Sequence, residues 1–281
     1  MLIKSVMLNK YRSSAVKKPG PITLKNVTFS RGGRKILDDI SISIPTGKII
    51  AVMGPSGTGK STLLKLITGE LKPDSGEVIF NNKNIPSMSS KALYQYRKEI
   101  GVMLQSNALF NELTVFENVA YPLREHFDLP EDFLNALVRM KLEKVGLRNA
   151  SSLMPSELSG GMARRVALAR AIVRDPSMMF YDEPFTGQDP ITRWVLLELI
   201  SRLHNTLNMT SLLVSHQVEM MNKLADVVYI LSEGKIVASG APKTVFKDKD
   251  PLVRKFVDGY SEGSEGMIHH PGPGLIEDLF K

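Results

Sequence analysis

The first part of the chain alternates hydrophobic and polar residues. Apolar residues recur at every second position around 22–29 and again around 40–44, and a similar short run spans 76–80. This spacing is typical of strands with one buried face, and the glycines at 32–33 and the asparagines at 81–82 predict turns. The N-terminal segment is therefore expected to form an antiparallel sheet.

Beyond residue 90 the hydrophobic positions take on a helical spacing. One face of a predicted helix carries Leu134, Leu137, Val138, Leu142 and Val145. Residues three and four apart share a helix face, and Gly146 stands where a helix C-terminus favours glycine. We expect a helical part over about 98–160, with a surface connection between Gln105 and Glu125, where Pro122 and polar residues interrupt the pattern.

Short apolar runs in the second half of the chain indicate buried strands. They lie at 178–181, 211–214 and 227–231, and an earlier run lies at 49–53. A long helical stretch follows Ser159, before the first of the three. Strands separated by helices are typical of a parallel sheet, so we predict an α/β fold with the antiparallel sheet beside it.

The apolar run at 49–53 leads into a glycine-rich loop. The loop has the spacing G-x-x-x-x-G-K-S and consists of Gly54, Pro55, Ser56, Gly57, Thr58, Gly59, Lys60 and Ser61. With Thr62 at the start of the following helix, it is the candidate nucleotide site, because backbone N–H groups and a helix N-terminus there bind phosphate. Lys60 is expected to reach the β- and γ-phosphates, and Ser61 to bind Mg²⁺. A chance glycine turn is the alternative, but the flanking strand and helix favour the nucleotide site.

Two carboxylates, Asp182 and Glu183, follow the apolar run at 178–181. A bound nucleotide needs a carboxylate near its Mg²⁺ and a base for the attacking water. We assign Asp182 to the metal and Glu183 to the base. Such a pair also occurs as ordinary solvated loop residues, but the glycine-rich loop makes that reading less favourable.

A second candidate anion site lies at Ser159, Gly160 and Gly161. Serine is a good helix N-cap, and the glycines leave the first backbone N–H groups of the helix accessible. A capped helix end that meets only water is the alternative. Because one nucleotide rarely needs two phosphate cradles, we expect the second to serve a nucleotide held by another copy of the chain.

The composition excludes several functions. The 281 residues include no cysteine, which excludes disulfides and thiolate chemistry, and no apolar run is long enough to span a bilayer. The N-terminus lacks the apolar core of a signal peptide, so the chain is expected to remain in the cytosol. The net charge of +7 favours an acidic partner, but no basic and aromatic pattern points to nucleic acid. Residues 1–20 are expected to form a flexible basic arm.

Four features together resemble the ATP-binding subunit of ATP-binding-cassette (ABC) transporters. They are the phosphate loop, Gln105 after an apolar strand, the Leu-Ser-Gly-Gly run at 158–161, and Asp182-Glu183 followed by Asp189 and His216. The resemblance implies an ATPase whose α/β P-loop NTPase domain, over 21–258, has an antiparallel β subdomain and a helical subdomain. It also implies a head-to-tail homodimer with two ATP molecules, each between the phosphate loop of one copy and residues 159–161 of the other.

The resemblance also implies roles for single residues. Gln105 would bind Mg²⁺ and sense the attacking water, His216 would contact the γ-phosphate, and Asp189 would couple the two ATP sites. Arg31 stands where the family places an aromatic residue that stacks on adenine, and a guanidinium plane can also stack on a base. Met162 replaces the usual glutamine beside the Ser159 cradle.

A narrower resemblance, to the MlaF type, rests on the segments at 107–110, 119–125, 153–158 and 185–190. It implies an ATPase that moves phospholipids between the inner and outer membranes and so maintains the lipid asymmetry of the outer membrane. The chain would lie peripherally on the cytoplasmic face of the bacterial inner membrane. Its implied partners are an MlaE-type permease, an MlaD-type periplasmic lipid-binding protein and a small MlaB-type cytosolic subunit. The alternatives are an ABC subunit for lipoprotein or amino acids, and a soluble ABC ATPase acting on ribosomes or DNA.

The residues at 259–281 exceed what a nucleotide-binding domain needs. A Ser-, Glu- and Gly-rich run at 261–266 predicts a flexible tether, and Leu275, Ile276 and Phe280 form a short apolar patch after it. Such a tail is either disordered or docks on the neighbouring ATPase subunit.

Overall fold

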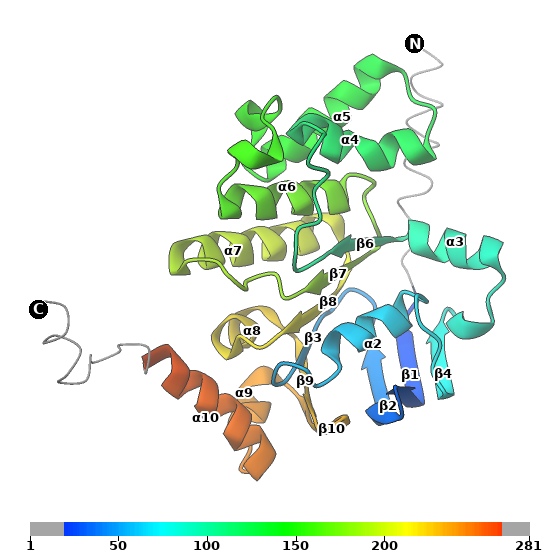
Figure 1. Ribbon diagram of the computed structural model, residues 1–281, viewed down its shortest axis with the longest axis vertical. Coiled ribbons are helices and arrows are strands. Elements are labelled where there is room, and N and C mark those ends of the chain that lie inside the picture. The colour runs from blue at the N-terminus through cyan, green and yellow to red at the C-terminus, as the bar shows by residue number, and fades with distance from the viewer. Residues whose placement is uncertain (1–19, 266–281) are drawn as a thin grey trace, which may run out of the picture.

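The computed structural model of the chain describes residues 20–265. Residues 1–19 of the expected basic arm and residues 266–281 of the expected tail lie outside this range. The described residues form two sheets with helices packed against them (Figure 1).

One sheet is antiparallel, as predicted. Its strand order is β2-β1-β4-β5, and its strands are β1 (Ile22–Arg31), β2 (Arg34–Ile44), β4 (Ser75–Phe80) and β5 (Lys83–Asn84). The predicted turns at 32–33 and 81–82 join β1 to β2 and β4 to β5. Buried Ile22 and Leu24 alternate with the more exposed Thr23 and Lys25 along β1, which confirms that one face of this sheet packs into the core.

The other sheet is mixed, with the order β10-β9-β3-β8-β7-β6. Its strands are β3 (Ile49–Met53), β6 (Ile100–Met103), β7 (Met178–Asp182), β8 (Thr210–Ser215), β9 (Val227–Ser232) and β10 (Lys235–Gly240). Neighbouring strands from β9 to β6 are parallel, as predicted, and β10 is an antiparallel edge strand that we did not predict. The expected start of the helical part near residue 98 is wrong, because residues 100–103 form β6 and pair with β7.

Strand β3 separates two hydrophobic cores. Ile50 and Val52 point toward the antiparallel sheet and the first helix, whereas Ile49, Ala51 and Met53 point toward the later helices. Both faces of β3 are therefore covered, and all its residues are buried. This explains the unbroken apolar run before the glycine-rich loop, since strands buried on both faces lose the alternation of half-exposed strands.

Helices cover both faces of this sheet and build a separate layer at one end. They are α2 (Lys60–Ile67), α3 (Ser90–Lys98), α4 (Val115–His126), α5 (Glu131–Lys144), α6 (Gly160–Ile172), α7 (Pro190–Leu207), α8 (Val218–Leu224), α9 (Pro242–Val245) and α10 (Pro251–Glu265). Figure 1 shows α4, α5 and α6 stacked beyond α7, away from the antiparallel sheet. The predicted apolar face of α5 is buried, and Gly146 follows the helix with a φ of 70°. Within residues 20–265, no helix combines the length and hydrophobicity that a membrane span requires.

The predicted surface connection between Gln105 and Glu125 is wrong in its second half, which is helix α4. Thr114 caps this helix in a reciprocal capping box with Glu117, and both hydrogen bonds are 3.2 Å long. Pro122 lies inside the helix. Proline removes one helical hydrogen bond, but the cap and the buried positions Val119 and Leu123 hold the helix against the core.

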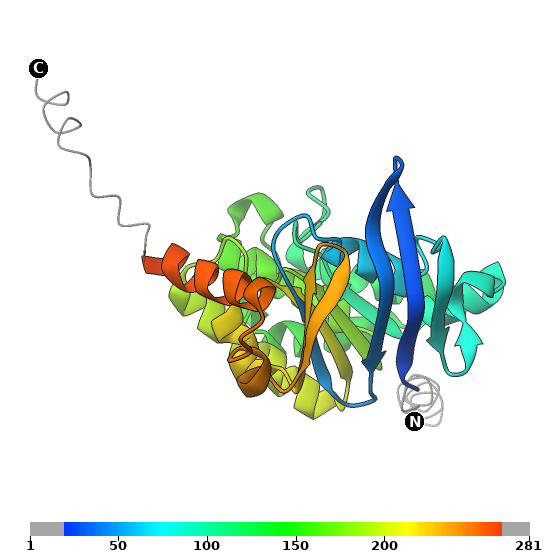
Figure 2. The same cartoon turned by 90° about the horizontal axis from the view of Figure 1, so that it is seen from below.

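The expected tether near the C-terminus is also wrong over most of its length. Helix α10 continues through Glu265, so the expected domain end at 258 falls inside a helix. Figure 2 shows α10 (orange-red) on the side of the molecule opposite α3 (cyan), and the long strands β1 and β2 (blue) next to each other. The apolar patch at 275–280 lies outside the described residues.

A buried ion pair joins α5 to the loop after α6. The Lys141 side chain is 1% exposed and contacts the carboxylate of Asp175. We expect Asp175→Asn to lower the free energy of unfolding by about 2–4 kcal/mol, because it leaves a buried ammonium without its counter-charge. Asparagine tolerates the φ of 49° at this position, so the backbone is not strained. Urea unfolding measures the loss, and the double variant Lys141→Met with Asp175→Asn should recover most of it; an equally unstable double variant contradicts the ion-pair explanation.

Buried His204 makes stability depend on pH. Its Nδ1 lies 2.9 Å from the hydroxyl of Ser211, and burial lowers the pKa of His204 below its ordinary value of 6.5. The unfolded chain therefore takes up this proton more readily, so stability falls as the pH drops below that value. We expect His204→Gln to show a shallower loss of unfolding free energy between about pH 7 and about pH 5. Equal slopes in urea titrations of both proteins would exclude His204 as a source of acid sensitivity.

Candidate functional site

The glycine-rich loop connects β3 to α2 and needs glycine at its first position. Gly54 has a φ of 150°, and a Cβ there would lie 2.0 Å from the carbonyl oxygen of Leu231. Gly59 precedes α2 with a φ of 101°, and no side chain caps the helix. The first backbone N–H groups of α2 are thus available to an anion rather than to a capping side chain.

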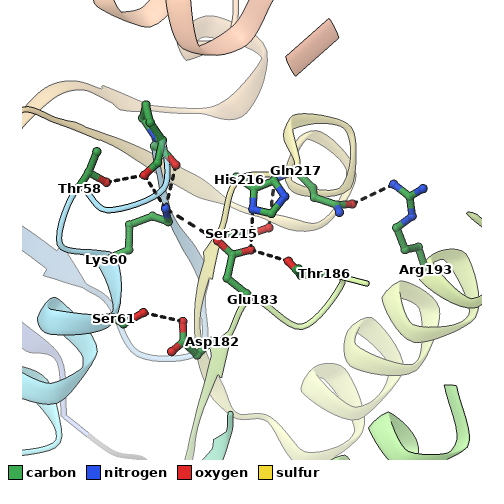
Figure 3. Close-up of polar contacts among 12 residues, drawn as sticks. Thr58, Lys60, Ser61, Asp182, Glu183, Thr186, Arg193, Ser215, His216 and Gln217 are labelled. Atoms are coloured by element: carbon green, nitrogen blue, oxygen red, sulfur yellow. Dashed lines mark hydrogen bonds and ion pairs between the residues drawn. The ribbon is translucent and has the colours of Figure 1, made fainter. Parts of the chain in front are cut away.

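Lys60 lies at the centre of this loop and is only 6% exposed. Its ammonium donates to the carbonyl oxygens of Gly54, at 2.9 Å, and Pro55, at 2.8 Å, and lies 3.8 Å from Oε1 of Glu183 (Figure 3). Burial lowers the pKa of Lys60, while the nearby carboxylates act in the opposite direction. The loop therefore holds a largely dehydrated cation, which attracts a phosphate more strongly than a solvated lysine does.

Ser61 and Asp182 meet although they are far apart in the sequence. The Ser61 hydroxyl donates to Oδ1 of Asp182 at 3.2 Å, because β3 and β7 flank β8 and end on the same edge of the sheet. Burial raises the pKa of Asp182. A hydroxyl and a carboxylate beside a phosphate-binding loop are the oxygen ligands that Mg²⁺ prefers.

Glu183 is held from several directions. Its φ is 49°, and its N–H donates to the carbonyl of Val214 at 2.9 Å. One carboxylate oxygen, Oε2, accepts a 3.1 Å hydrogen bond from the Thr186 hydroxyl and lies 2.9 Å from Nδ1 of His216 (Figure 3). The carboxylate is 8% exposed as part of its residue and faces Lys60, so it is placed as a base beside the loop.

A cavity of about 390 Å³ brings most of the predicted residues together. It is lined by Arg31, Ile36, Ser56, Gly57, Gly59, Lys60, Ser61, Thr62, Gln105, Glu183, Thr186 and His216. This volume lies in the range of small-molecule and cofactor sites. Our sequence reasoning did not assign Ile36 or Thr186 to the site. Thr186 carries one signal, its position three residues after the candidate base, in the turn that begins at Glu183.

Comparison with known proteins decides the family. The family model described as ABC transporter matches residues 37–186. The intermembrane phospholipid transport system ATP-binding protein MlaF of Haemophilus influenzae is 49% identical over 260 residues, which make up 92% of this chain and 98% of that protein. The chain belongs to the ABC transporter family.

Other relatives agree with this assignment. The MlaF protein of Escherichia coli K12 is 53% identical over 242 residues, 86% of this chain and 90% of that protein. Among solved structures, cbiO1 from Clostridium perfringens, part of an ABC transporter complex, has a TM-score of 0.75 at 29% identity over 88% of this chain and 98% of its own. The ATP-binding cassette MJ0796, in a dimeric post-hydrolysis state with ADP and Pi, has a TM-score of 0.72 at 28% identity over 79% of this chain and 98% of its own. The ABC ATPase fold and the resemblance to the MlaF type are confirmed.

Two predicted elements of the ABC cassette lie outside its own cavity. Ser159 caps α6 by accepting a 3.2 Å hydrogen bond from the N–H of Met162, and Gly161 packs so tightly that a Cβ would lie 2.9 Å from the Thr192 side chain. Asp189 caps α7 by accepting from the N–H of Thr192 at 3.0 Å. The N-termini of α6 and α7 are therefore neighbours, and neither lines the cavity beside Lys60.

Proposed function

We propose that the chain is the ATP-hydrolysing subunit of an ABC transporter complex that moves phospholipids between the inner and outer membranes. The observation that carries the proposal is the meeting of Lys60, Ser61, Glu183 and His216 in one cavity. Phosphate-binding, metal-binding and proton-accepting groups then act on the same nucleotide. The phospholipid cargo is inferred from the names of the relatives at 49% and 53% identity.

The chain's own residues divide the work of hydrolysis. The loop amides, the α2 N-terminus and Lys60 would bind the phosphates, and Ser61, Asp182 and Gln105 would hold Mg²⁺. Bound Mg²⁺ would neutralise phosphate charge. Glu183 would take a proton from the attacking water while the Thr186 hydroxyl keeps its carboxylate in place. Because Nδ1 of His216 lies on Glu183, we assign Nε2 of that ring to the γ-phosphate.

We infer that a second copy of the chain completes each site. Ser159, Gly160 and Gly161 lie outside the cavity of their own chain, and Asp189 lies beside them. In a head-to-tail homodimer these residues would face the partner's ATP, which agrees with the dimeric state named for the related cassette MJ0796. Arg31 lines the same cavity as Lys60, where its guanidinium would stack on adenine.

A groove of about 500 Å³ suits a membrane partner. It is lined in part by Val102, Phe110 and Tyr121, whose side chains remain 39%, 42% and 41% exposed. Exposed aromatic residues gathered in a groove are typical of protein–protein contacts. We assign this groove to an MlaE-type permease, which would place the chain on the cytoplasmic face of the bacterial inner membrane. MlaD-type and MlaB-type proteins would complete the complex.

Co-purification from bacterial membranes tests the proposal. The full-length chain should bring down a multispanning permease with bound phospholipid, and the purified complex should hydrolyse ATP. The main alternative is another cargo, since relatives at 36–37% identity are named probable ribonucleotide transport proteins. A permease that carries lipoprotein, amino acids or nucleotides in place of phospholipid would overturn the cargo. Recovery with ribosomes or DNA would instead support a soluble ABC ATPase.

A further inference from the structure

Arg164 connects two loops of the candidate site from outside the cavity. It lies on α6 and is 5% exposed. Its Nη1 donates to the carbonyl oxygens of Leu104, at 3.2 Å, and Gln105, at 2.5 Å, and its Nη2 donates to the carbonyl of Thr186 at 3.0 Å. One guanidinium therefore bridges two backbone segments that are distant in the sequence.

Both segments carry residues of the site. Gln105 follows β6 and lines the cavity beside Lys60. Thr186 lines the same cavity, and its hydroxyl donates to Oε2 of Glu183 at 3.1 Å. A shift of either carbonyl would thus move a group that faces the nucleotide, and misplacements of about 1 Å can cost about a hundredfold in rate.

We propose that Arg164 is a positioning residue, which holds the Gln105 loop and the Glu183–Thr186 turn in one fixed arrangement. This inference rests on the proposed ATP hydrolysis. A guanidinium suits the task because its donors are fixed in one plane, so that two acceptors on different segments are held at a set separation. Lysine carries the same charge but has a single ammonium on a flexible stem.

The remaining atoms of Arg164 agree with a role in bridging rather than in charge pairing. No carboxylate pairs with it among the ion pairs of residues 20–265, and its buried Nε has no hydrogen-bond partner within that range. All its hydrogen bonds within the described residues go to backbone carbonyls. Helix α6 also begins next to Ser159, so the same rigid helix joins the partner-facing cradle to both loops.

Arg254 on α10 provides a matched control. Its guanidinium donates to the backbone carbonyl of Phe246 at 3.1 Å and, like that of Arg164, has a buried Nε without a partner in the described part of the chain. It does not line the cavity beside Lys60. Arg254→Gln therefore removes a similar carbonyl contact without touching either loop.

The experiment compares the full-length wild type with Arg164→Gln, Arg164→Lys and Arg254→Gln. Hydrogen–deuterium exchange without nucleotide should become faster around both Gln105 and Thr186 in Arg164→Gln, and in neither segment in Arg254→Gln. In ATPase assays Arg164→Gln should lower kcat by at least about tenfold while KM stays within about twofold, because the phosphate loop is intact. Arg164→Lys should remain impaired in kcat, since one ammonium cannot hold both segments.

The outcomes separate the inference from the proposed function. Unchanged exchange in Arg164→Gln, a kcat no lower than that of Arg254→Gln, or full rescue by Arg164→Lys would each overturn the positioning role. A wild-type protein without ATPase activity would reject the proposed function, whereas the exchange data would still decide whether Arg164 bridges the loops. Binding of a fluorescent ATP analogue by Arg164→Gln shows that the variant is folded.

Discussion

Replacing Lys60 with alanine should abolish measurable ATP hydrolysis, with a fall in kcat/KM of at least about 10³-fold. Lys60 is the buried cation of the phosphate loop, held by the carbonyls of Gly54 and Pro55. A phosphate that enters the loop would meet this charge in a site with little water, where an ammonium–phosphate contact is much stronger than in solution. The fall corresponds to about 4 kcal/mol of lost transition-state stabilisation.

The matched control for this variant is Lys48→Ala. Lys48 lies just before β3, at the opposite end of the strand from the loop, and pairs with Asp226 at 3.1 Å on the surface. Its loss removes the same charge but should leave kcat/KM within about twofold, because exposed ion pairs contribute little. Steady-state hydrolysis and nucleotide titration of both variants decide the matter. ATPase activity that survives in Lys60→Ala would show that the loop amides alone provide the grip.

The phosphate loop could be predicted because its information is local. The strand, the glycines and the start of α2 lie in one continuous segment, and the φ of 150° at Gly54 is a backbone requirement that the sequence states directly. The pairing of Ser61 with Asp182 is different, since these residues are 121 positions apart. Their meeting depends on β8 lying between β3 and β7, and strand order is a property of the whole fold. Only the resemblance to a family joined them in advance.

The errors also have physical causes. Pro122 is a helix breaker by local preference, yet burial of the neighbouring α4 residues outweighs that preference. Residues 261–265 have a composition typical of linkers, yet they continue helix α10. Arg164 gave no signal at all, because an arginine on a helix becomes informative only when the carbonyls that it reaches are known. Residues that act through tertiary contacts cannot be recognised from spacing.

Glu183→Gln should bind ATP but hydrolyse it at least about 10²-fold more slowly. The amide has nearly the same shape as the carboxylate and can still accept the hydrogen bond from Thr186. It cannot accept a proton from water, so only the chemical step is blocked. Since the grip of Lys60 and the loop remains, the variant should accumulate as an ATP-bound dimer, which size-exclusion chromatography separates from the nucleotide-free form.

Glu233→Gln is the appropriate control for this last substitution. Glu233 also follows a strand of the same sheet, β9, and has a φ of 50°, but it is exposed and does not line the cavity beside Lys60. It should hydrolyse ATP at the wild-type rate within about twofold and should not be trapped as a dimer. Rapid single-turnover hydrolysis by Glu183→Gln in the assembled complex would exclude Glu183 as the base. A slow variant that remains monomeric with ATP would instead keep the base and reject closure of the dimer around the nucleotide.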